Sequence, residues 1–248
     1  MILKHVISAT AIALSLSAQT SWAESSPKPK YGPEATTLTR SHEYFRRADA
    51  PDFWALIPYY TAQQTGSACS LASVTMVMNG ARSMKKLTVD DELVTQDSLL
   101  KKTGSTLWQR ATAAKLGFGV TLDQLGELVG QSFKAYGFNG AKVEVVHAEN
   151  AQDIKTRLHQ ALVENEKSSN DFIIINFNQK IYTGDAEVGH IAPIAAYDAV
   201  KKKVLVLDPD RQWYEPYWVS EETLLAGMAT KDTMAGKNRG FVWVKFSQ

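Results

Sequence analysis

The sequence predicts an α+β fold in which a helical N-terminal part packs on a C-terminal antiparallel sheet. In the first half of the chain, apolar residues recur at helical spacing, as Val74, Val77, Met78 and Ala81 do at i, i+3, i+4 and i+7. From Phe172 onwards, short β-rich runs are separated by polar turns. Because helices come first and strands later, without regular alternation, the class is α+β rather than α/β.

The N-terminus has the pattern of an export signal. Lys4 precedes the apolar stretch Val6–Ala18, and Ser21-Trp22-Ala23 places small residues where a signal peptidase cuts. The apolar stretch is shorter than the about 20 residues that span a bilayer. We therefore expect a cleaved signal peptide at residues 1–23 rather than a membrane anchor, and an exported protein, periplasmic in a Gram-negative source. Residues 24–35, polar with prolines, predict a flexible leader, and residues 36–248 a single domain.

Charge argues against two classes of partner. Removing residues 1–23 takes one lysine from the 27 basic residues, and the 26 that remain match 26 acidic ones. A neutral chain with scattered lysines has no electrostatic footprint for nucleic acid. We expect no nucleic-acid partner and, after signal cleavage, no membrane partner.

The elements follow in order along the chain. A helix is expected to begin at Cys69 and to close at Asn79-Gly80 or shortly after. Further helices are predicted around Val89–Lys101, Ser105–Leu116, Leu122–Tyr136 and Gln152–Asn165, with a strand at Ala141–His147 between the last two. Later strands are predicted at Phe172–Phe177, Ile191–Tyr197, Val204–Leu207 and Phe241–Phe246.

Cys69 is the single cysteine of the chain. Exported proteins usually pair their cysteines in disulfides, so an unpaired one needs a reason. A buried core thiol is the plainer interpretation. However, Cys69 lies where a loop enters a helix, and a helix N-terminus stabilises a thiolate. The position therefore favours a nucleophile.

A cysteine nucleophile needs a base, usually a histidine oriented by a third polar group. His190 opens an apolar strand, and a turn near residues 199–200 would bring residues 208–210 of the returning strand opposite it. Cross-strand neighbours lie about 5 Å apart, so Asp208 could reach the imidazole. A His–Asp pair in a hairpin can also be only a surface pair. Together with Cys69 it becomes the leading hypothesis for a catalytic site.

An oxyanion donor would complete such a site. Gln63 and Gln64 precede Cys69 by six and five residues, and the amide of either could join the Cys69 backbone N–H. A solvent-facing loop glutamine is the alternative for each of them.

These residues, in this order, resemble the papain-like cysteine peptidases, and within them the bacterial short forms of the phytochelatin synthase family. The likeness runs in register from residue 53 to residue 246. It is carried by the segments Gln63–Val74, Met78-Asn79, Thr95–Asp97, Val120–Leu125, Gly140–Glu144, Gly189–Tyr197, Leu207–Arg211 with Tyr214, Pro216 and Trp218, and Arg239–Val242.

The resemblance implies a papain-like fold and a catalytic domain at residues 36–248. It implies Cys69 as nucleophile, His190 as base and Asp208 as its orienter, and it favours Gln63 over Gln64 as the oxyanion glutamine. By the same likeness, Arg211, Tyr214 and Gly189 match substrate-binding positions. The substrate it implies is glutathione, cleaved at its Cys–Gly bond by hydrolysis or by transfer of γ-glutamylcysteine. No tightly bound cofactor is expected. Cadmium or zinc would enter as thiolate complexes of the substrate, because the sequence shows no metal-ligand spacing.

Some positions depart from the family pattern. Ser70 stands where a glycine usually follows the cysteine, and Asp210 adds an acid next to Arg211. A peptidase of the double-glycine leader type, which shares the Gln…Cys and His…Asp-Pro patterns, is one alternative. A non-catalytic thiol-peptide binder is another. The sequence leaves the oligomeric state open, with a homodimer as one candidate.

Overall fold

The computed structural model describes residues 28–247. The predicted signal peptide at residues 1–23 lies outside the described residues. Within them, no helix combines the length and the apolar character that crossing a bilayer requires.

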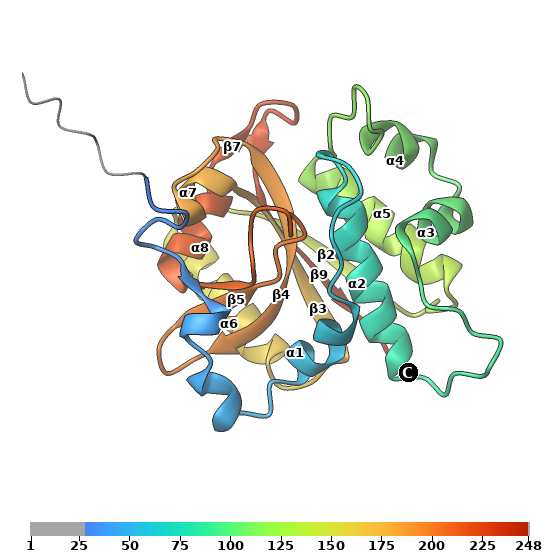
Figure 1. Cartoon of the computed structure of the whole chain (residues 1–248), viewed down its shortest axis with the longest axis horizontal. Coiled ribbons are helices and arrows are strands. Elements are labelled where there is room, and N and C mark those ends of the chain that lie inside the picture. Colours follow the sequence, from blue (N-terminus) through green and yellow to red (C-terminus); the bar gives the residue numbers. More distant parts are fainter. Residues whose placement is uncertain (1–27, 248) are drawn as a thin grey trace, which may run out of the picture.

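A seven-stranded antiparallel sheet forms the centre of the molecule, in the order β1-β6-β5-β4-β3-β9-β2 (Figure 1). The strands are β1 (Thr36–Thr37), β6 (Tyr217–Ser220), β5 (Lys203–Val206), β4 (Gly189–Asp198), β3 (Asp171–Asn178), β9 (Gly240–Lys245) and β2 (Lys142–His147). A small separate hairpin joins β7 (Lys231–Asp232) to β8 (Lys237–Asn238). The expected strands are therefore present, and β1, β6, β7 and β8 are additional.

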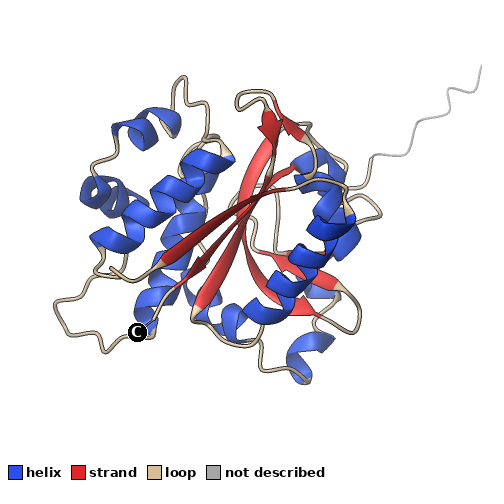
Figure 2. Ribbon diagram, turned by 180° about the vertical axis from the view of Figure 1, so that it is seen from behind, coloured by secondary structure: helices blue, strands red, loops and turns tan. Residues whose placement is uncertain are grey.

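Helices cover both faces of this sheet (Figure 2). Apolar side chains of α1 (Pro51–Leu56), α2 (Cys69–Ser83), α3 (Gln96–Thr103), α4 (Thr106–Ala111) and α5 (Leu122–Ala135) form one core with one face. Those of α6 (Gln152–Asn165), α7 (Gln179–Thr183) and α8 (Glu221–Met228) form a second core with the other. Three short 3-10 helices, η1 (Leu38–Arg40), η2 (Glu43–Arg46) and η3 (Ile57–Tyr59), complete the N-terminal part.

The sequence of β3 is apolar without alternation because both faces of the strand are buried. Phe172 and Ile174 belong to the first core, whereas Ile173 and Ile175 belong to the second. A strand buried on both faces has no solvent side that would select polar residues. The α+β class is thus confirmed, and the sheet carries helices on both of its faces, a point on which the sequence made no prediction.

Helix boundaries show where local patterns mislead. The helix expected at Val89–Lys101 starts only at Gln96, because Thr95 caps it in a reciprocal box with Ser98. The helix expected at Ser105–Leu116 ends at Ala111. In contrast, α2 continues past Gly80 to Ser83.

Gly80 continues the helix for a packing reason. A Cβ at this position would lie 3.0 Å from Leu56 Cδ2 and 3.2 Å from the Phe172 ring. The glycine therefore allows α2 to approach α1 and β3 closely and is not a stop signal.

Part of the predicted flexible leader is packed against the domain. Tyr31 lies edge-on to Tyr214 and contacts the ring of Tyr217, with both centroid distances at 5.9 Å. The Gly32 amide donates to the carbonyl of Thr183 at 2.7 Å. These contacts join residues 31 and 32 of the predicted leader to the domain, and the flexibility of the leader stays a prediction.

Candidate active site

Cys69 is the first residue of α2 and is 7% exposed. The hydroxyl of Ser73, one turn further on, lies 2.7 Å from the Cys69 carbonyl oxygen and 3.0 Å from that of Ile191 on β4. This contact joins the first turn of α2 to the strand that carries the histidine. The sulfur therefore sits at a helix N-terminus, where the helix dipole favours a negative charge.

His190 lies at the start of β4, 7% exposed, with its Nε2 2.7 Å from Asp208 Oδ1. Because Asp208 engages Nε2, Nδ1 is the ring nitrogen left for the Cys69 side chain. The ring of Phe177 packs at a right angle on the imidazole, with centroids 5.5 Å apart. Burial opposes the imidazolium, but the Asp208 carboxylate and the Cys69 side chain together raise the pKa of His190 well above its usual value.

Asp208 is fully buried and held by several donors. Its Oδ1 accepts from the amide of Asp210 at 2.9 Å, and its Oδ2 accepts from the hydroxyl of Tyr217 at 2.9 Å and from Gln179 Nε2 at 3.4 Å. Burial alone would raise the pKa of this carboxyl, yet His190 and these donors lower it below its usual value. The orienting group is thus a fixed carboxylate.

The sheet register brings His190 and Asp208 together as the hairpin argument expected. Ile194 pairs with Val206, and a bulge follows between Ile194 and Ala196. Continuing this pairing places the residues after β5 opposite the start of β4. The predicted trio of Cys69, His190 and Asp208 therefore forms one cluster, and the catalytic roles of its members remain predictions.

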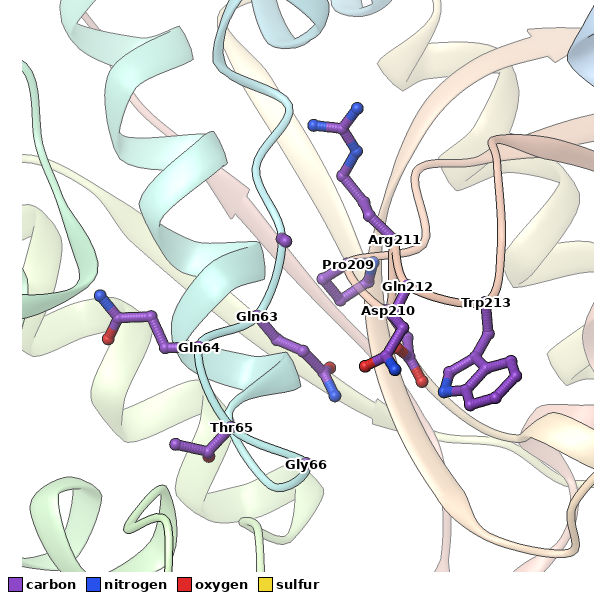
Figure 3. A pocket seen from close by; sticks show the side chains of 10 residues that line it. Gln63, Gln64, Thr65, Gly66, Pro209, Asp210, Arg211, Gln212 and Trp213 are labelled. Atoms are coloured by element: carbon purple, nitrogen blue, oxygen red, sulfur yellow. The ribbon is translucent and has the colours of Figure 1, made fainter.

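Gln63 and Gln64 point in different directions. In Figure 3, Gln63 extends into a cavity towards Asp210, whereas Gln64 turns away from it. The amide N–H of Gln63 donates to the Pro209 carbonyl at 2.8 Å, and Gln96 Oε1 accepts from the Gln64 amide at 3.2 Å. The buried Oε1 of Gln63 has no partner among the described residues. The structure thus separates the directions of the two side chains, and the role of Gln63 as an oxyanion donor stays a prediction.

Three cavities surround the cluster. The Cys69 cavity, of about 220 Å³, is lined by Cys69, Asn176, Gly189, Asp232 and Arg239 among others. The His190 cavity, of about 360 Å³, is lined by Gln179, Asp185, His190, Asp210, Trp213 and Tyr214 among others. The Gln63 cavity, of about 510 Å³, shares Asp210 and Trp213 with it.

Arg239 is the residue of the Cys69 cavity that sequence reasoning missed as a site residue. Its Nη1 donates to the Lys231 carbonyl at 2.6 Å and to the Thr230 hydroxyl at 3.1 Å. Its Nε is buried and has no partner among the described residues. Burial lowers the pKa of Arg239, although Asp232 opposes that effect. The only sequence signal was the Arg239–Val242 segment of the resemblance, which assigned this arginine no role.

The residues predicted to bind substrate are divided among the cavities. Gly189 lines the Cys69 cavity, where a Cβ would lie 3.1 Å from Arg239 Nη2. Tyr214 lines the His190 cavity and donates its hydroxyl to Asp185 at 2.7 Å. Arg211 borders the Gln63 cavity, but its side chain points away from Gln63 and stacks on Tyr60 at 4.4 Å (Figure 3).

The remaining described histidines and acids make other contacts. His147 binds Asp123 at 2.8 Å, and His159 contacts Glu221 at 3.1 Å. Within residues 28–247, no group of three or more His, Cys, Asp and Glu side chains is arranged to hold a metal ion.

Comparison with known proteins gives a consistent result. The family model described as phytochelatin synthase matches residues 35–241. Glutathione gamma-glutamylcysteinyltransferase 1 of Lotus japonicus is 28% identical over 199 residues, 77% of this chain and 35% of that protein. The protein of the same name from Arabidopsis thaliana is 25% identical over 206 residues, 82% of this chain and 39% of that protein. The chain thus spans less than half the length of these curated relatives.

Proposed function

The chain belongs to the phytochelatin synthase family, and from this premise we propose that it cleaves the Cys–Gly bond of glutathione through an acyl-enzyme on Cys69. The observation that carries the proposal is the buried His190–Asp208 pair, 2.7 Å apart, whose imidazole leaves Nδ1 for Cys69 at the start of α2. A helix-start cysteine against a sheet that carries the histidine on β4, with the aspartate two residues after β5, also supports assignment to the papain-like fold.

In the acylation step, the Cys69 thiolate attacks the carbonyl carbon of the cysteinyl residue of glutathione. The Gln63 amide and the Cys69 backbone N–H stabilise the oxyanion. His190 then gives its Nδ1 proton to the departing glycine nitrogen as the C–N bond breaks. Asp208 keeps the imidazole oriented throughout, because its own carboxylate is fixed by Tyr217 and Gln179.

The Cys69 cavity suits the γ-glutamyl end of the substrate. That end carries a carboxylate and an ammonium group on one carbon. Arg239 lines the cavity and has a buried Nε without a partner among the described residues, and Asp232 lines the cavity from the β7–β8 hairpin. A guanidinium and a carboxylate in one small cavity match both charges. We therefore assign the γ-glutamyl group to this side of Cys69.

Deacylation completes the reaction in one of two ways. Water attacks the thioester and releases γ-glutamylcysteine, or an amine takes the acyl group and forms a longer product. His190 removes the proton from either nucleophile. In this proposal, metal ions such as cadmium act as thiolate complexes of the substrate, not as resident cofactors.

The test is a product analysis by mass spectrometry. Purified protein is incubated with reduced glutathione, with and without cadmium, beside Cys69→Ala and Asp208→Asn. The proposal expects free glycine and γ-glutamylcysteine from the wild type, none from Cys69→Ala, and a rate at least 100-fold lower from Asp208→Asn. Products of the form (γ-Glu-Cys)n-Gly would show transfer. If a folded, reduced wild type releases no glycine, the proposal fails and a non-catalytic thiol-peptide binder takes its place.

A further inference from the structure

Two side chains from separate segments hold the Oδ2 atom of Asp208. Tyr217, the first residue of β6, donates its hydroxyl at 2.9 Å, and Gln179, the first residue of α7, donates its Nε2 at 3.4 Å. Such donors stabilise the charged form of a carboxyl only while they stay within hydrogen-bond distance. The charge of Asp208 therefore depends on how β6 and α7 are placed relative to each other.

Tyr31 of the predicted leader contacts the chain at the start of β6 and directly before it. Its ring lies edge-on to the ring of Tyr214 and also contacts that of Tyr217, with both centroid distances at 5.9 Å. Its hydroxyl accepts from the amide of Glu215 at 2.9 Å. The aromatic contacts and the hydrogen bond together restrict this stretch of chain. Tyr31 thus supports the ring whose hydroxyl reaches Asp208.

The next residue, Gly32, contacts the other segment, at the end of α7. Its amide donates to the Thr183 carbonyl at 2.7 Å, and a Cβ on Gly32 would lie 3.2 Å from that carbonyl oxygen. The ammonium group of Lys28 contacts the carbonyl of Gly184. Within α7, the Thr183 hydroxyl donates to the carbonyl of Gln179 at 3.1 Å. A contact at the last residue of this short helix therefore also restrains its first.

Residues 31 and 32 lie outside the part of the chain that the family model covers, which begins at residue 35. Membership of the family therefore assigns this pair no role, and its contacts have to indicate one. Through its first residue the pair holds the chain at β6, and through its second it holds the end of α7. The pair thus joins the two segments that supply Asp208 with side-chain donors.

We propose that Tyr31 and Gly32 are positioning residues for the reaction, because they fix the two side-chain donors of Asp208. This inference rests on the proposed function, in which Asp208 orients the catalytic imidazole. Neither Tyr31 nor Gly32 lines the Cys69 cavity or the His190 cavity. Their effect is therefore exerted through Asp208 and not through contact with the substrate.

Loss of this contact would act through the charge of Asp208. When its donors move away, the carboxyl of Asp208 takes up a proton at a higher pH than before. A neutral Asp208 no longer stabilises the imidazolium of His190, and the thiolate of Cys69 then loses the positive charge beside it. Cys69 should therefore react more slowly at low pH. At pH 8 Asp208 stays charged, and the rate should be unchanged.

Other titratable groups also lie close to Asp208 and stay in place when the contact is lost. His190 faces it from β4, and the hydroxyl of Tyr60 donates to its backbone carbonyl at 2.7 Å. Asp210 donates its amide to the carboxylate at 2.9 Å. Burial and the charge of Asp208 raise the pKa of Asp210, whereas His190 and Lys30 oppose that rise. Because Lys30 is itself a leader residue, a test has to separate its charge from the contact.

The test measures the alkylation rate of Cys69 by iodoacetamide from pH 4.5 to pH 8. This assay needs no glutathione and reports on the single thiol of the chain. Tyr31→Ala should lower the rate at pH 4.5 by about threefold or more and leave the rate at pH 8 within about twofold of the wild type. Gly32→Ala should act in the same direction, because its Cβ crowds the Thr183 carbonyl. Tyr31→Phe keeps the ring contacts and should stay close to the wild type.

Two control variants separate the alternatives. Lys30→Gln removes the charge near Asp210 and keeps Tyr31. Tyr136→Ala removes a half-buried tyrosine on the far side of α2, where its ring contacts Arg82 and Lys102. Both should leave the pH dependence of alkylation unchanged. Circular dichroism at each pH establishes that the compared proteins are folded, and if Tyr31→Ala is not, Gly32→Ala decides.

Three outcomes would overturn the inference. The first is a wild-type pH dependence in both Tyr31→Ala and Gly32→Ala. The second is an equal loss of rate at every pH, which a purely structural role would give. The third is a Lys30→Gln variant that reproduces the change seen in Tyr31→Ala.

Glycine release from glutathione, measured on the same proteins, separates this inference from the proposed function. If both hold, kcat/KM for Tyr31→Ala should fall at pH 4.5 and approach the wild-type value at pH 8. If the wild type releases no glycine but alkylation of Tyr31→Ala shows the expected pH dependence, the proposed function fails and the positioning role of Tyr31 stands. If glycine is released and the alkylation profiles do not differ, the proposed function stands and the positioning role falls.

Discussion

Replacing Glu166 with glutamine should make the protein more stable at pH 8 and leave it nearly unchanged at pH 4.5. Glu166 follows α6 and lies between the two halves of the fold. Its carboxylate accepts from the Tyr44 hydroxyl at 2.6 Å and from the Tyr197 amide at 2.5 Å. Burial raises the pKa of Glu166 to about 7, and these two donors only partly oppose the shift. Glutamine keeps the shape and removes the charge.

The magnitude follows from the linkage between proton binding and folding. The ordinary pKa of a glutamate, which applies in the unfolded chain, is 4.5. Because the folded value is higher, the folded state holds the proton more tightly, and stability is lost as pH rises from about 4.5 through 7. At about 1.4 kcal/mol for each pKa unit, the loss from Glu166 is about 3 kcal/mol. Burial also raises the pKa of Asp52 and of Asp171, so they act in the same direction.

Urea unfolding followed by tryptophan fluorescence, at intervals from pH 4.5 to pH 8.5, measures the effect. The free energy of unfolding of Glu166→Gln minus that of the wild type should rise by about 3 kcal/mol across this range. Titrating groups that do not interact with Glu166 cancel in the difference, whereas Asp52, whose pKa the charge of Glu166 helps to raise, adds to the rise. Glu164→Gln, an exposed residue of the same helix paired with Lys167, is the matched control and should give a flat difference. A flat difference for Glu166→Gln as well would refute the reasoning.

Three further predictions concern the site. Tyr217→Phe removes one hydrogen bond to the charged Asp208, worth about 1.5–3 kcal/mol, and the pKa of Asp208 should therefore rise. We expect kcat/KM for glycine release to fall at pH 5–6 and to approach the wild-type value at pH 8. A uniform loss of kcat/KM at all pH values would contradict this prediction. Arg239→Gln should raise KM for glutathione at least tenfold with a smaller change in kcat. The control Arg157→Gln removes the pair with Glu144 and a contact with the Trp243 ring, both away from the Cys69 cavity, and should change neither constant. A fall in kcat alone for Arg239→Gln would argue against the γ-glutamyl assignment. Ser70→Gly deprives the buried Trp108 Nε1 of its acceptor at 3.0 Å and adds a glycine inside a helix, so the free energy of unfolding should fall by about 2 kcal/mol. The alkylation rate of Cys69 should stay within about twofold of the wild type. Unchanged stability would show that the serine has no structural role.

Local patterns predicted the elements whose stability is local. The helix α5 was recognisable because Thr121 caps it and its apolar face is regular, and α6 begins and ends where its amphipathic pattern does. Where tertiary packing decides, the local pattern gave no exact boundary. The continuation of α2 through Gly80 depends on Leu56 and Phe172, which are distant in sequence. The anchoring of Tyr31 depends likewise on Tyr214 and Tyr217.

The residues of the candidate site likewise fall into those that the sequence revealed and those that depend on tertiary packing. Cys69, His190 and Asp208 could be found because each lies at a helix or strand boundary whose position the sequence reveals. Gln179 could not be found, because it follows a strand and meets Asp208 only when the sheet has formed. Arg239 becomes a cavity residue only because β9 pairs with both β3 and β2, which brings it beside the start of β4.

The Cys69 cavity and the His190 cavity share two stretches of chain and differ in the rest. Residues 176–179 and 188–191, around the end of β3 and the start of β4, contribute to both linings. Residues 118–120 and the β7–β8 region line only the Cys69 cavity, whereas the turn after β5 lines only the His190 cavity of these two. Natural variation in these unshared loops could therefore reshape one cavity while the shared strands keep the other. Protein engineers could exploit the same arrangement by exchanging one unshared loop at a time.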